Sequence, residues 1–259
     1  MYKLICGDAR DELKKLIDEG VSVDLTVTSP PYGNLRTYNN TLEWNLNICQ
    51  EIINQLFIIT KDGGIVVWVV NDKTVKGSKT GDSFKEALMF MEAGFNLHDT
   101  MIWEKENPLP VIKTKRYNPV FEYMFIFSKG TPKTFNPIMI PCKCAGKLYN
   151  STCKNINAES GRTHKTFNIN KEKIKGNIWE MAVAQNKGNI KHPAVFPEKL
   201  AYDHILSWSN EGDLVLDPFV GSGTTGIAAL KLNRNFIGID KVKEYIDMSQ
   251  TRIENLKQE

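Results

Sequence analysis

The residues best suited to chemistry stand in the stretch Thr28-Ser29-Pro30-Pro31-Tyr32. The apolar run at residues 23–27 just before it predicts a buried strand. Two prolines end such a strand, because proline has no N–H to donate to the sheet. The strand end then presents a hydroxyl, a carbonyl and an aromatic ring. These groups suit a flat, polar ligand with an amino group, such as a nucleobase, and the alternative is an ordinary turn that ends a strand.

A second ligand-binding motif lies near the other end of the sequence. Gly221, Gly223 and Gly226 match the pattern G-x-G-x-x-G between a predicted strand and a predicted helix, and Asp240 follows Gly221 by 19 residues. Glycines let the backbone approach a ligand closely, and a helix N-terminus offers N–H groups to an anion. An acid at the next strand end can bind ribose hydroxyls, or it can cap a helix instead. The motif predicts a site for a nucleoside with an anionic group.

Two features separate this motif from the usual dinucleotide fingerprint. Only 33 residues follow Gly226, so most strands of the sheet must come from the chain before the motif. The predicted sheet is therefore circularly permuted. The sequence Asp217-Pro218-Phe219 before the glycines is also foreign to the dinucleotide pattern. Both features argue against NAD as the ligand.

These motifs need a sheet to position them, and the hydrophobic pattern predicts one. Strands are expected at residues 2–5, 23–27, 65–70, 96–103, 121–127, 214–217 and 236–239, and helices at 11–19, 42–60, 82–93, 198–209, 224–232 and 243–257. A continuous β-branched run such as residues 65–70 is typical of a strand buried on both faces of a parallel sheet. Strands that alternate with helices predict an α/β fold with helices on both faces.

The charge is concentrated in one segment. The chain has a formal net charge of +3, but residues 130–191 hold 11 Lys or Arg and 3 Glu, a net of +8, which leaves −5 for the remainder. This distribution predicts a polyanion-binding insertion on a nearly neutral scaffold. The alternative is a solvated loop rich in lysine. The segment shows no sustained period of 2 or 3.6, so it is expected to be irregular.

Composition and cysteine usage narrow the class of protein. Hydrophobic residues make up 41% of the 259 residues, as in ordinary globular proteins, and the longest apolar run is too short to span a bilayer. The N-terminal residues lack the long apolar region of a signal peptide, so a soluble cytoplasmic protein is expected. Five cysteines without a regular spacing fit a reducing compartment. Cys142 and Cys144, with Cys153 and His164, suggest zinc only weakly, because their spacing is not that of zinc fingers, and no metal is expected.

The early and late motifs together resemble those of the S-adenosylmethionine-dependent DNA amino-methyltransferases. A catalytic motif first, an insertion in the middle and a glycine loop last resembles the beta class of these enzymes, of the restriction-modification type. Three further stretches are similar to family motifs: Cys6-Gly7-Asp8-Ala9, the segment from Arg116-Tyr117-Asn118 to Phe127-Ser128-Lys129, and His192-Pro193-Ala194-Val195-Phe196-Pro197-Glu198-Lys199-Leu200. The resemblance covers about residues 1–129 and 177–257 and leaves the basic segment unmatched.

The resemblance implies a fold and a domain organisation. The fold is a circularly permuted Rossmann-like methyltransferase fold, with a seven-stranded, mostly parallel sheet, helices on both faces and an irregular target-recognition insertion. Residues 1–129 would form the catalytic half of the methyltransferase domain. Residues 130–191 would form the basic target-recognition insertion, and residues 192–259 the cofactor-binding half.

The resemblance also implies S-adenosylmethionine as the cofactor and assigns a role to each matching residue. The catalytic residues would be Ser29, Pro30, Pro31 and Tyr32. Asp8 and Ala9 would lie near the adenine of the cofactor, Asp240 on the ribose and Asp217 beside the sulfonium. The methionine end would be held by Phe219, Gly221, Gly223 and Thr224, and capped by the segment with His192, Pro193, Phe196 and Lys199. Thr28 and Ser222 complete the expected cofactor residues. Arg116 would face the DNA, and the basic segment adds Lys171, Lys173 and Lys175 as expected DNA contacts.

The residues of the early motif and the family resemblance point to the same mechanism. The target base is flipped out of the duplex, because its amino group cannot be reached inside the stack. Tyr32 would stack on the base, while the Pro30 carbonyl and the Ser29 hydroxyl accept the two amino N–H bonds. Serine at the first position, where many adenine enzymes have aspartate, resembles the N4-cytosine enzymes and favours cytosine, and N6-adenine stays open. Pro141-Cys142 is a poor match for a carbon-5 cytosine enzyme, because it lies inside the basic segment.

A role without catalysis is the remaining functional interpretation of this sequence. The chain could be a module that binds S-adenosylmethionine or DNA without transferring a methyl group, although the intact early motif and the intact glycine loop argue against it. Double-stranded DNA is the expected partner. A homodimer and a cognate restriction endonuclease are possible partners that the sequence does not decide.

Overall fold

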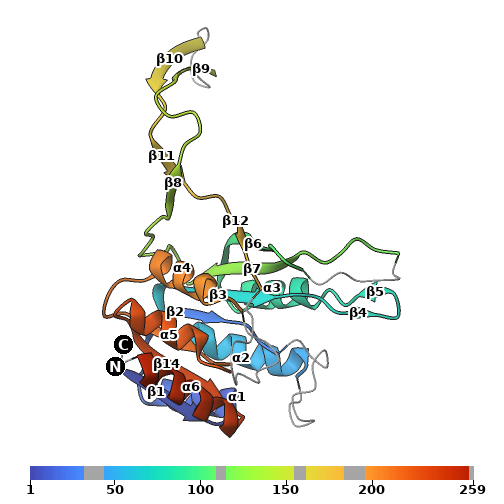
Figure 1. Cartoon of the computed structure of the whole chain (residues 1–259). Helices are drawn as coiled ribbons and strands as arrows, with labels where there is room; N and C mark the ends of the chain where they lie inside the picture. Colours follow the sequence, from blue (N-terminus) through green and yellow to red (C-terminus); the bar gives the residue numbers. More distant parts are fainter. Residues whose placement is uncertain (32–43, 109–114, 155–161, 184–195, 257–259) are drawn as a thin grey trace. The chain divides into compact units, whose positions relative to one another are not determined.

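The computed structural model describes residues 1–31, 44–108, 115–154, 162–183 and 196–256 (Figure 1). The chain forms two compact units. Unit 1 comprises Met1–Asn136 and Asn177–Glu259, and unit 2 comprises Pro137–Gly176. Within the described residues, no helix combines the length and apolar character that crossing a bilayer requires.

Unit 1 is built on an eight-stranded sheet in the order β1-β14-β13-β2-β3-β7-β6-β12. Its strands are β1 (Tyr2–Cys6), β2 (Val23–Thr28), β3 (Thr60–Val70), β6 (Asn96–Lys105), β7 (Phe121–Ser128), β12 (Ile178–Met181), β13 (Leu214–Asp217) and β14 (Asn235–Asp240). Only the pairings of β7 with β3 and with β6 are antiparallel. The permuted, mostly parallel α/β sheet is confirmed, with one strand more than the seven expected, because β12 pairs with the edge strand β6.

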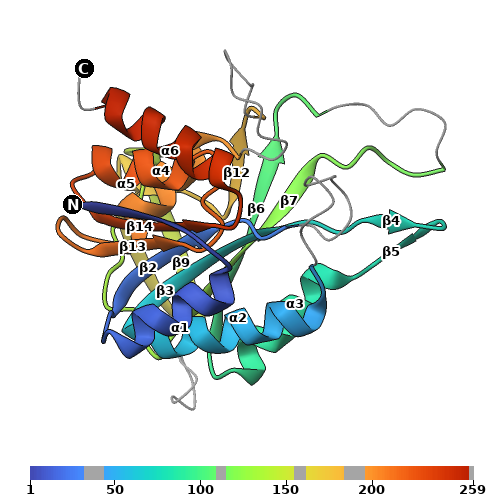
Figure 2. The same ribbon diagram turned by 90° about the horizontal axis from the view of Figure 1, so that it is seen from below.

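Helices cover both faces of this sheet, as predicted (Figure 2). One layer holds α1 (Ala9–Asp18), α2 (Leu46–Ile59) and α3 (Asp82–Glu92), and the other holds α4 (Glu198–Trp208), α5 (Thr224–Lys231) and α6 (Lys243–Leu256). One face of α2 is buried in the core, with Ile52, Ile53 and Leu56 at most 1% exposed. Each such side chain stabilises the fold by roughly 1.5–3 kcal/mol through the hydrophobic effect.

Aromatic side chains fill the core between β3, β7 and the α1–α3 layer. Phe90 and Phe127 stack with ring centroids 4.0 Å apart, and Trp68 meets Phe90 edge-on at 5.0 Å. All three rings have no exposed surface. This packing joins β3 to β7 and α3, and β3 is in turn the sheet neighbour of β2, the strand that carries the early motif.

Residues 74–79 form a small hairpin between β3 and α3. β4 (Thr74–Val75) and β5 (Ser78–Lys79) pair across Lys76 and Gly77, which both have a positive φ, of 47° and 81°. Two-residue turns of this kind match the twist of hairpin strands.

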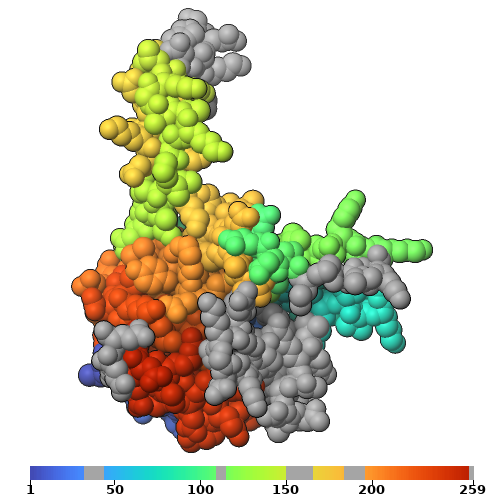
Figure 3. All heavy atoms as spheres, viewed as in Figure 1, coloured from blue at the N-terminus to red at the C-terminus, as the bar shows by residue number. Residues whose placement is uncertain are grey.

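Unit 2 consists of two antiparallel ladders. β8 (Met139–Pro141) pairs with β11 (Glu172–Ile174), and β9 (Leu148–Lys154) pairs with β10 (Arg162–Asn168). The expectation of an irregular segment is corrected here. None of the side chains described in unit 2 is buried, and in Figure 3 the segment is a narrow column of atoms. A strand exposed on both faces needs no alternation of apolar and polar residues, so its sequence shows no period of 2.

Two asparagines of unit 1 stand where the chain leaves it for unit 2 and returns. The Asn136 side chain donates to the carbonyls of Leu206 and Ser209, both at 3.1 Å, at the end of α4. The Asn177 carbonyl accepts from the N–H of Ile102 in β6 at 2.9 Å. Both residues are thus tied to the scaffold by hydrogen bonds.

Candidate functional site

Four parallel strands, β1, β14, β13 and β2, bring their carboxyl ends to one edge of the sheet. After β13 the chain crosses through α5 to β14, whereas after β2 it crosses through α2 to β3 on the opposite side. The two crossovers diverge between β13 and β2, which makes this a topological switch point. Open α/β sheets bind their ligands at such points.

Asp217, the last residue of β13, ties this strand end to β2 and to α5. Its Oδ1 accepts from the Thr28 hydroxyl at 2.6 Å and from the Phe219 N–H at 3.0 Å, and its Oδ2 accepts from the Thr225 hydroxyl at 2.7 Å. The side chain is 1% exposed, and burial raises its pKa to about 6 against the lowering effect of the Thr28 and Thr225 bonds. Asp217 thus orients the loop that follows it, and its proposed contact with a cationic ligand stays a prediction.

The glycine loop begins directly after this network. Gly221 and Gly223 both have a left-handed backbone, with φ of 49° and 81°, which is a conformation that favours glycine. Gly223 is the N-cap of α5, and no side chain of the described residues caps that helix end. The N-terminus of α5 therefore offers backbone N–H groups and a positive dipole to an anion.

Asp240 at the end of β14 holds the same loop from the side. Its Oδ2 accepts from the Gly221 N–H at 3.0 Å and its Oδ1 from the Val242 N–H at 2.9 Å. Burial raises the pKa of this carboxyl. The bond to Val242 closes a short turn ahead of α6, which begins at Lys243, so Asp240 organises both the glycine loop and the start of the last helix.

Two residues of α6 that the sequence analysis did not single out also shape the loop. The Ser249 hydroxyl donates to the Gly221 carbonyl at 2.7 Å, and Arg252 donates to the Ser222 carbonyl and, at 3.5 Å, to the Thr224 hydroxyl. A Cβ on Gly223 would come within 2.9 Å of the Ser249 Oγ. Ser222 and Thr224 are themselves buried, so their side chains belong to the wall of the loop.

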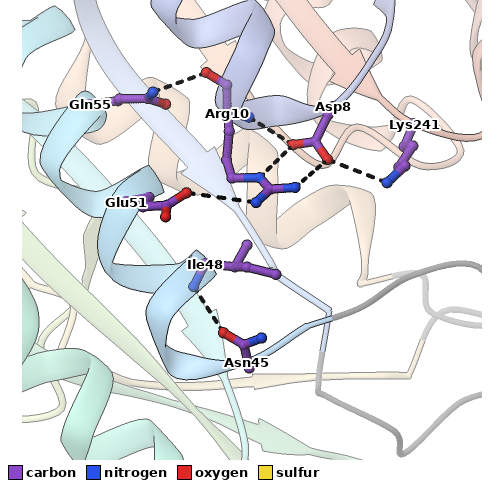
Figure 4. A network of polar contacts seen from close by, with 7 residues as sticks. All are labelled: Asp8, Arg10, Asn45, Ile48, Glu51, Gln55 and Lys241. Carbon is purple, nitrogen blue, oxygen red and sulfur yellow. Dashed lines mark hydrogen bonds and ion pairs between the residues drawn. The ribbon is translucent and has the colours of Figure 1, made fainter.

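Asp8 lies at the end of β1 and is the N-cap of α1, with Ala9 buried as the first helical residue. Arg10 donates to both Asp8 oxygens at 3.0 Å, and Lys241 approaches Oδ2 at 3.3 Å (Figure 4). The side-chain bond from Arg10 holds the pKa of Asp8 well below its usual range. Arg10 also faces Glu51 of α2 at 3.7 Å. The negative charge of Asp8 is therefore balanced by cations from α1 and from the end of β14.

The early motif continues directly from β2. Thr28 is the last residue of that strand, Ser29 and Pro31 are half-buried, and Pro30 is buried. Thr28 lies 2.6 Å from Asp217, so Ser29 begins beside the glycine-loop strand. Tyr32 lies outside the described residues. The structure thus brings the Ser-Pro-Pro turn and the glycine loop to the same switch point.

Phe219 lies between two tryptophans. It meets Trp44 edge-on at 5.3 Å, just before α2, and Trp68 of β3 at 6.3 Å. The ring is half-buried, because it rests on the aromatic core on one side. Phe219 is therefore held by both strand β3 and the chain that leads into α2.

The remaining candidate residues lie in separate places. Phe196 is half-buried just ahead of α4, and Lys199 in its first turn is exposed and pairs with Asp203 at 2.9 Å. His192 and Pro193 lie outside the described residues. Among the described side chains, no three His, Cys, Asp or Glu residues are grouped as a metal site requires.

The expected DNA contacts fall in both units. Arg116 of unit 1 is exposed and donates to the Gly77 carbonyl at the tip of the β4–β5 hairpin. In unit 2, Lys171, Lys173 and Lys175 lie at alternate positions along and beside β11. Only Lys173 belongs to β11 (Glu172–Ile174), while Lys171 stands just before the strand and Lys175 just after it, so the three positive charges lie within five residues of the chain.

Comparison with known proteins gives a consistent result. Residues 23–251 match the model of a family described as DNA methylase, N6_N4_Mtase. The chain is 48% identical to the orphan methyltransferase M.BamHII of Bacillus amyloliquefaciens, over 90% of this chain and 89% of that protein.

Two solved structures share the fold. A complex of M1.HpyAVI with SAM is 24% identical, with a TM-score of 0.67 over 98% of this chain and 99% of that one. The cytosine-N4-specific PvuII DNA methyltransferase is 21% identical, with a TM-score of 0.67 over 99% of this chain and 92% of that one. At these identities the likeness concerns the fold alone.

Proposed function

The chain belongs to the DNA methylase family, and we propose that it transfers a methyl group from S-adenosylmethionine to the exocyclic amino group of a base in duplex DNA, at cytosine N4 in preference to adenine N6. The observation that carries this proposal is the 2.6 Å bond between Thr28 and Asp217. It joins the strand end of the Ser-Pro-Pro motif to the strand end of the glycine loop, so that a base and a cofactor bound there would meet.

The donor groups of the glycine loop fit this cofactor. The α5 N-terminus, without a side-chain cap among the described residues, suits the carboxylate of a methionine moiety. Asp240 accepts one backbone bond from Gly221 of the loop and one from Val242 ahead of α6, and an ionised carboxylate has about four acceptor positions, which leaves room for ribose hydroxyls. We assign the adenine end to Asp8 and Ala9, and the methionine end to Phe219 and the glycine loop.

When bound, S-adenosylmethionine supplies a methyl group on a positively charged sulfur. The task of the chain is to make the base amine a nucleophile, because the nitrogen lone pair is delocalised into the ring. We assign this task to the Pro30 carbonyl and the Ser29 hydroxyl, which accept the two amino N–H bonds and favour a pyramidal nitrogen. In the transfer the nitrogen would form the new N–C bond, the electrons of the C–S bond would return to sulfur and leave a neutral thioether, and the proton lost by the nitrogen would pass to water. Catalysis would then rest on positioning and electrostatics.

DNA would be held mainly through its phosphates. Lys171, Lys173 and Lys175 gather positive charge at and beside β11, and Arg116 adds a guanidinium beside the β4–β5 hairpin. Phosphate contacts set the register of a protein on DNA, whereas contacts to base edges select the sequence. We therefore propose that these residues contribute to the affinity for DNA and not to the choice of its sequence. Tyr32 is proposed to stack on the flipped base.

The choice of base rests on Ser29. The family model spans both N6 and N4 enzymes by its name, so membership does not choose between adenine and cytosine. Serine at the first motif position favours cytosine N4 by resemblance, and adenine N6 is the second candidate.

A methyl-transfer assay tests the proposal. The purified chain is incubated with plasmid DNA and methyl-labelled S-adenosylmethionine, and the digested nucleosides are identified by mass spectrometry. N4-methylcytosine supports the proposal in full, and N6-methyladenine retains the enzyme but overturns the base assignment. Binding of S-adenosylmethionine without transfer to either base would favour a non-catalytic module. Calorimetric binding of NAD in its place would overturn the cofactor.

A homodimer is proposed on a separate observation. On α3, the side chains of Phe84, Leu88 and Met91 follow helical spacing and are 53%, 58% and 49% exposed. Such a stripe is suited to a second copy of the chain, and light scattering of the purified protein tests it. A cognate endonuclease and a cytoplasmic location stay predictions.

A further inference from the structure

The aromatic core behind the glycine loop contains a carboxyl group. Glu86 of α3 is 5% exposed, and its Oε2 accepts a bond from the Trp68 indole N–H at 2.7 Å. Trp68 itself has no exposed surface. A buried carboxyl is costly unless it is well bonded, so its presence here calls for a reason beyond packing.

Trp68 connects this carboxyl to the candidate site by two routes. Its ring meets the Phe219 ring at 6.3 Å with an interplanar angle of 72°. Its backbone is the direct neighbour of Thr28 in the β2–β3 ladder, and the Thr28 hydroxyl binds Asp217. The Trp68 ring is therefore placed to affect the glycine loop through Phe219, and its strand is the neighbour of β2, which ends at Thr28.

The surroundings of Glu86 keep its ionisation close to neutral pH. Burial raises the pKa of Glu86 to about 7 against the lowering effect of the Trp68 bond, and the negative charges of Asp82 and Asp72 add to the rise. Cys49 of α2 lies close enough for the two groups to interact, since burial and then the charge of Glu86 raise the pKa of its thiol. Glu86 therefore changes its protonation state when the pH passes through the neutral range.

We propose that Glu86 is a positioning residue for the cofactor loop, acting through Trp68 and Phe219, so that the protonation state of a core carboxyl sets how tightly the loop binds S-adenosylmethionine. This inference rests on the proposed function. An ionised Glu86 accepts a charge-assisted bond from the indole, which is shorter and stronger than the bond to a neutral carboxyl. The Trp68 ring, and with it Phe219, is then held more firmly, and the cofactor binds more tightly at higher pH.

The experiment measures the dissociation constant of S-adenosylmethionine by calorimetry between pH 6 and pH 8.5 for the full chain and for Glu86→Gln. The cofactor has its own titrating amino group, which acts equally on both proteins and cancels in their ratio. We expect the affinity of the parent to rise about fivefold more than that of the variant across this range. Glu92→Gln is the matched control, because Glu92 is an exposed residue at the end of the same helix.

Trp68→Phe gives an independent test, because it keeps a ring against Phe219 but removes the N–H donor. We expect Trp68→Phe to weaken S-adenosylmethionine binding at high pH and to abolish the pH dependence that Glu86→Gln removes. The double variant with both substitutions should bind S-adenosylmethionine no more weakly than either single variant. Glu86→Asp serves as a second variant if Glu86→Gln folds poorly.

Equal pH profiles for the parent and Glu86→Gln, or additive losses in the double variant, would overturn the inference. If the parent binds no S-adenosylmethionine at any pH, the proposed cofactor is wrong and the inference falls with it. That outcome is distinct from tight binding without pH dependence, which removes only the role of Glu86.

Discussion

Thr28 and Asp217 are 189 positions apart in the chain, yet the hydroxyl of one lies 2.6 Å from the carboxylate of the other. Each is the last residue of its strand, and the two strands are neighbours in the sheet. The circular permutation explains the pairing, because it places the two halves of one site at opposite ends of the sequence. The bond is buried, so water does not compete for it.

Replacing Thr28 tests this link. Thr28→Val keeps the shape of the side chain but leaves a buried carboxyl with one partner fewer, which should lower the free energy of unfolding by about 1–3 kcal/mol. Methyl transfer should fall as well, because Ser29 and the glycine loop lose their common anchor. Thr28→Ser restores the hydroxyl and should recover most of both quantities in urea unfolding and activity assays. A Thr28→Val protein with full stability and turnover would show that the bond has no such role.

Glu86 should make the stability of the fold depend on pH. Its pKa rises from an ordinary 4.5 to about 7 on folding, so the folded state holds the proton more tightly than the unfolded state. The contribution to stability is complete below pH 4.5 and is lost as the pH rises to about 7, at a cost on the order of 3 kcal/mol. Glu86→Gln should therefore gain stability over the parent with rising pH, as measured by unfolding at pH 5 and pH 8. A constant difference between the two proteins would contradict this prediction.

The glycine loop allows a matched pair of substitutions. Gly223 and Gly20 both have a left-handed backbone, with φ of 81° and 73°, but a Cβ on Gly223 would come within 2.9 Å of Ser249 whereas none lies within 4 Å at Gly20. Alanine at either position should cost about 1–2 kcal/mol of stability through the backbone alone. Only Gly223→Ala should also weaken S-adenosylmethionine binding, because the loop must shift away from α6. Calorimetry on both variants checks this, and equal affinities would place the cofactor elsewhere.

The lysines of unit 2 should govern the salt dependence of DNA binding. Neutralised phosphates release counterions, so the logarithm of affinity falls with the logarithm of salt concentration by about 0.9 for each contact. Replacing Lys171, Lys173 and Lys175 together by glutamine should flatten that slope by up to about three units and leave cofactor affinity unchanged.

A matched control for the lysine variant removes the same charge from unit 1. Lys3, Lys14 and Lys15 are exposed on β1 and α1, and their replacement should change the slope far less. Equal slopes for the two triple variants would mean that only net charge matters, and DNA would then have to be held by another surface.

The scaffold could be predicted from the sequence because its strands are buried. The run at residues 65–70 lies within β3, whose last eight residues from Gly63 onward are nearly all buried, and its β-branched residues marked it clearly. The glycine spacing and the acid at the next strand end likewise located the loop and Asp240. These signals are local in the chain, which is why they survive without a structure.

Other features depend on contacts between distant residues and left no local signal. Ser249 and Arg252 lie on α6 among other polar residues, and nothing in their spacing shows that they reach the glycine loop. Glu86 looked like one more charged helical residue, although it is buried beneath Trp68. The strands of unit 2 were missed because their exposed faces carry no hydrophobic alternation, and β12 because it is only four residues long.

The two asparagines at the root of unit 2 make that segment a replaceable module. Asn136 is fastened to the end of α4 and Asn177 to β6, and neither anchor uses a residue from the ladders between them. Antiparallel ladders tolerate changes of length in pairs of residues, since a short turn can close them at any level. A change of length in the ladders therefore leaves both anchors and the strand ends at the switch point in place, so the proposed DNA contacts of this segment can vary on a constant scaffold.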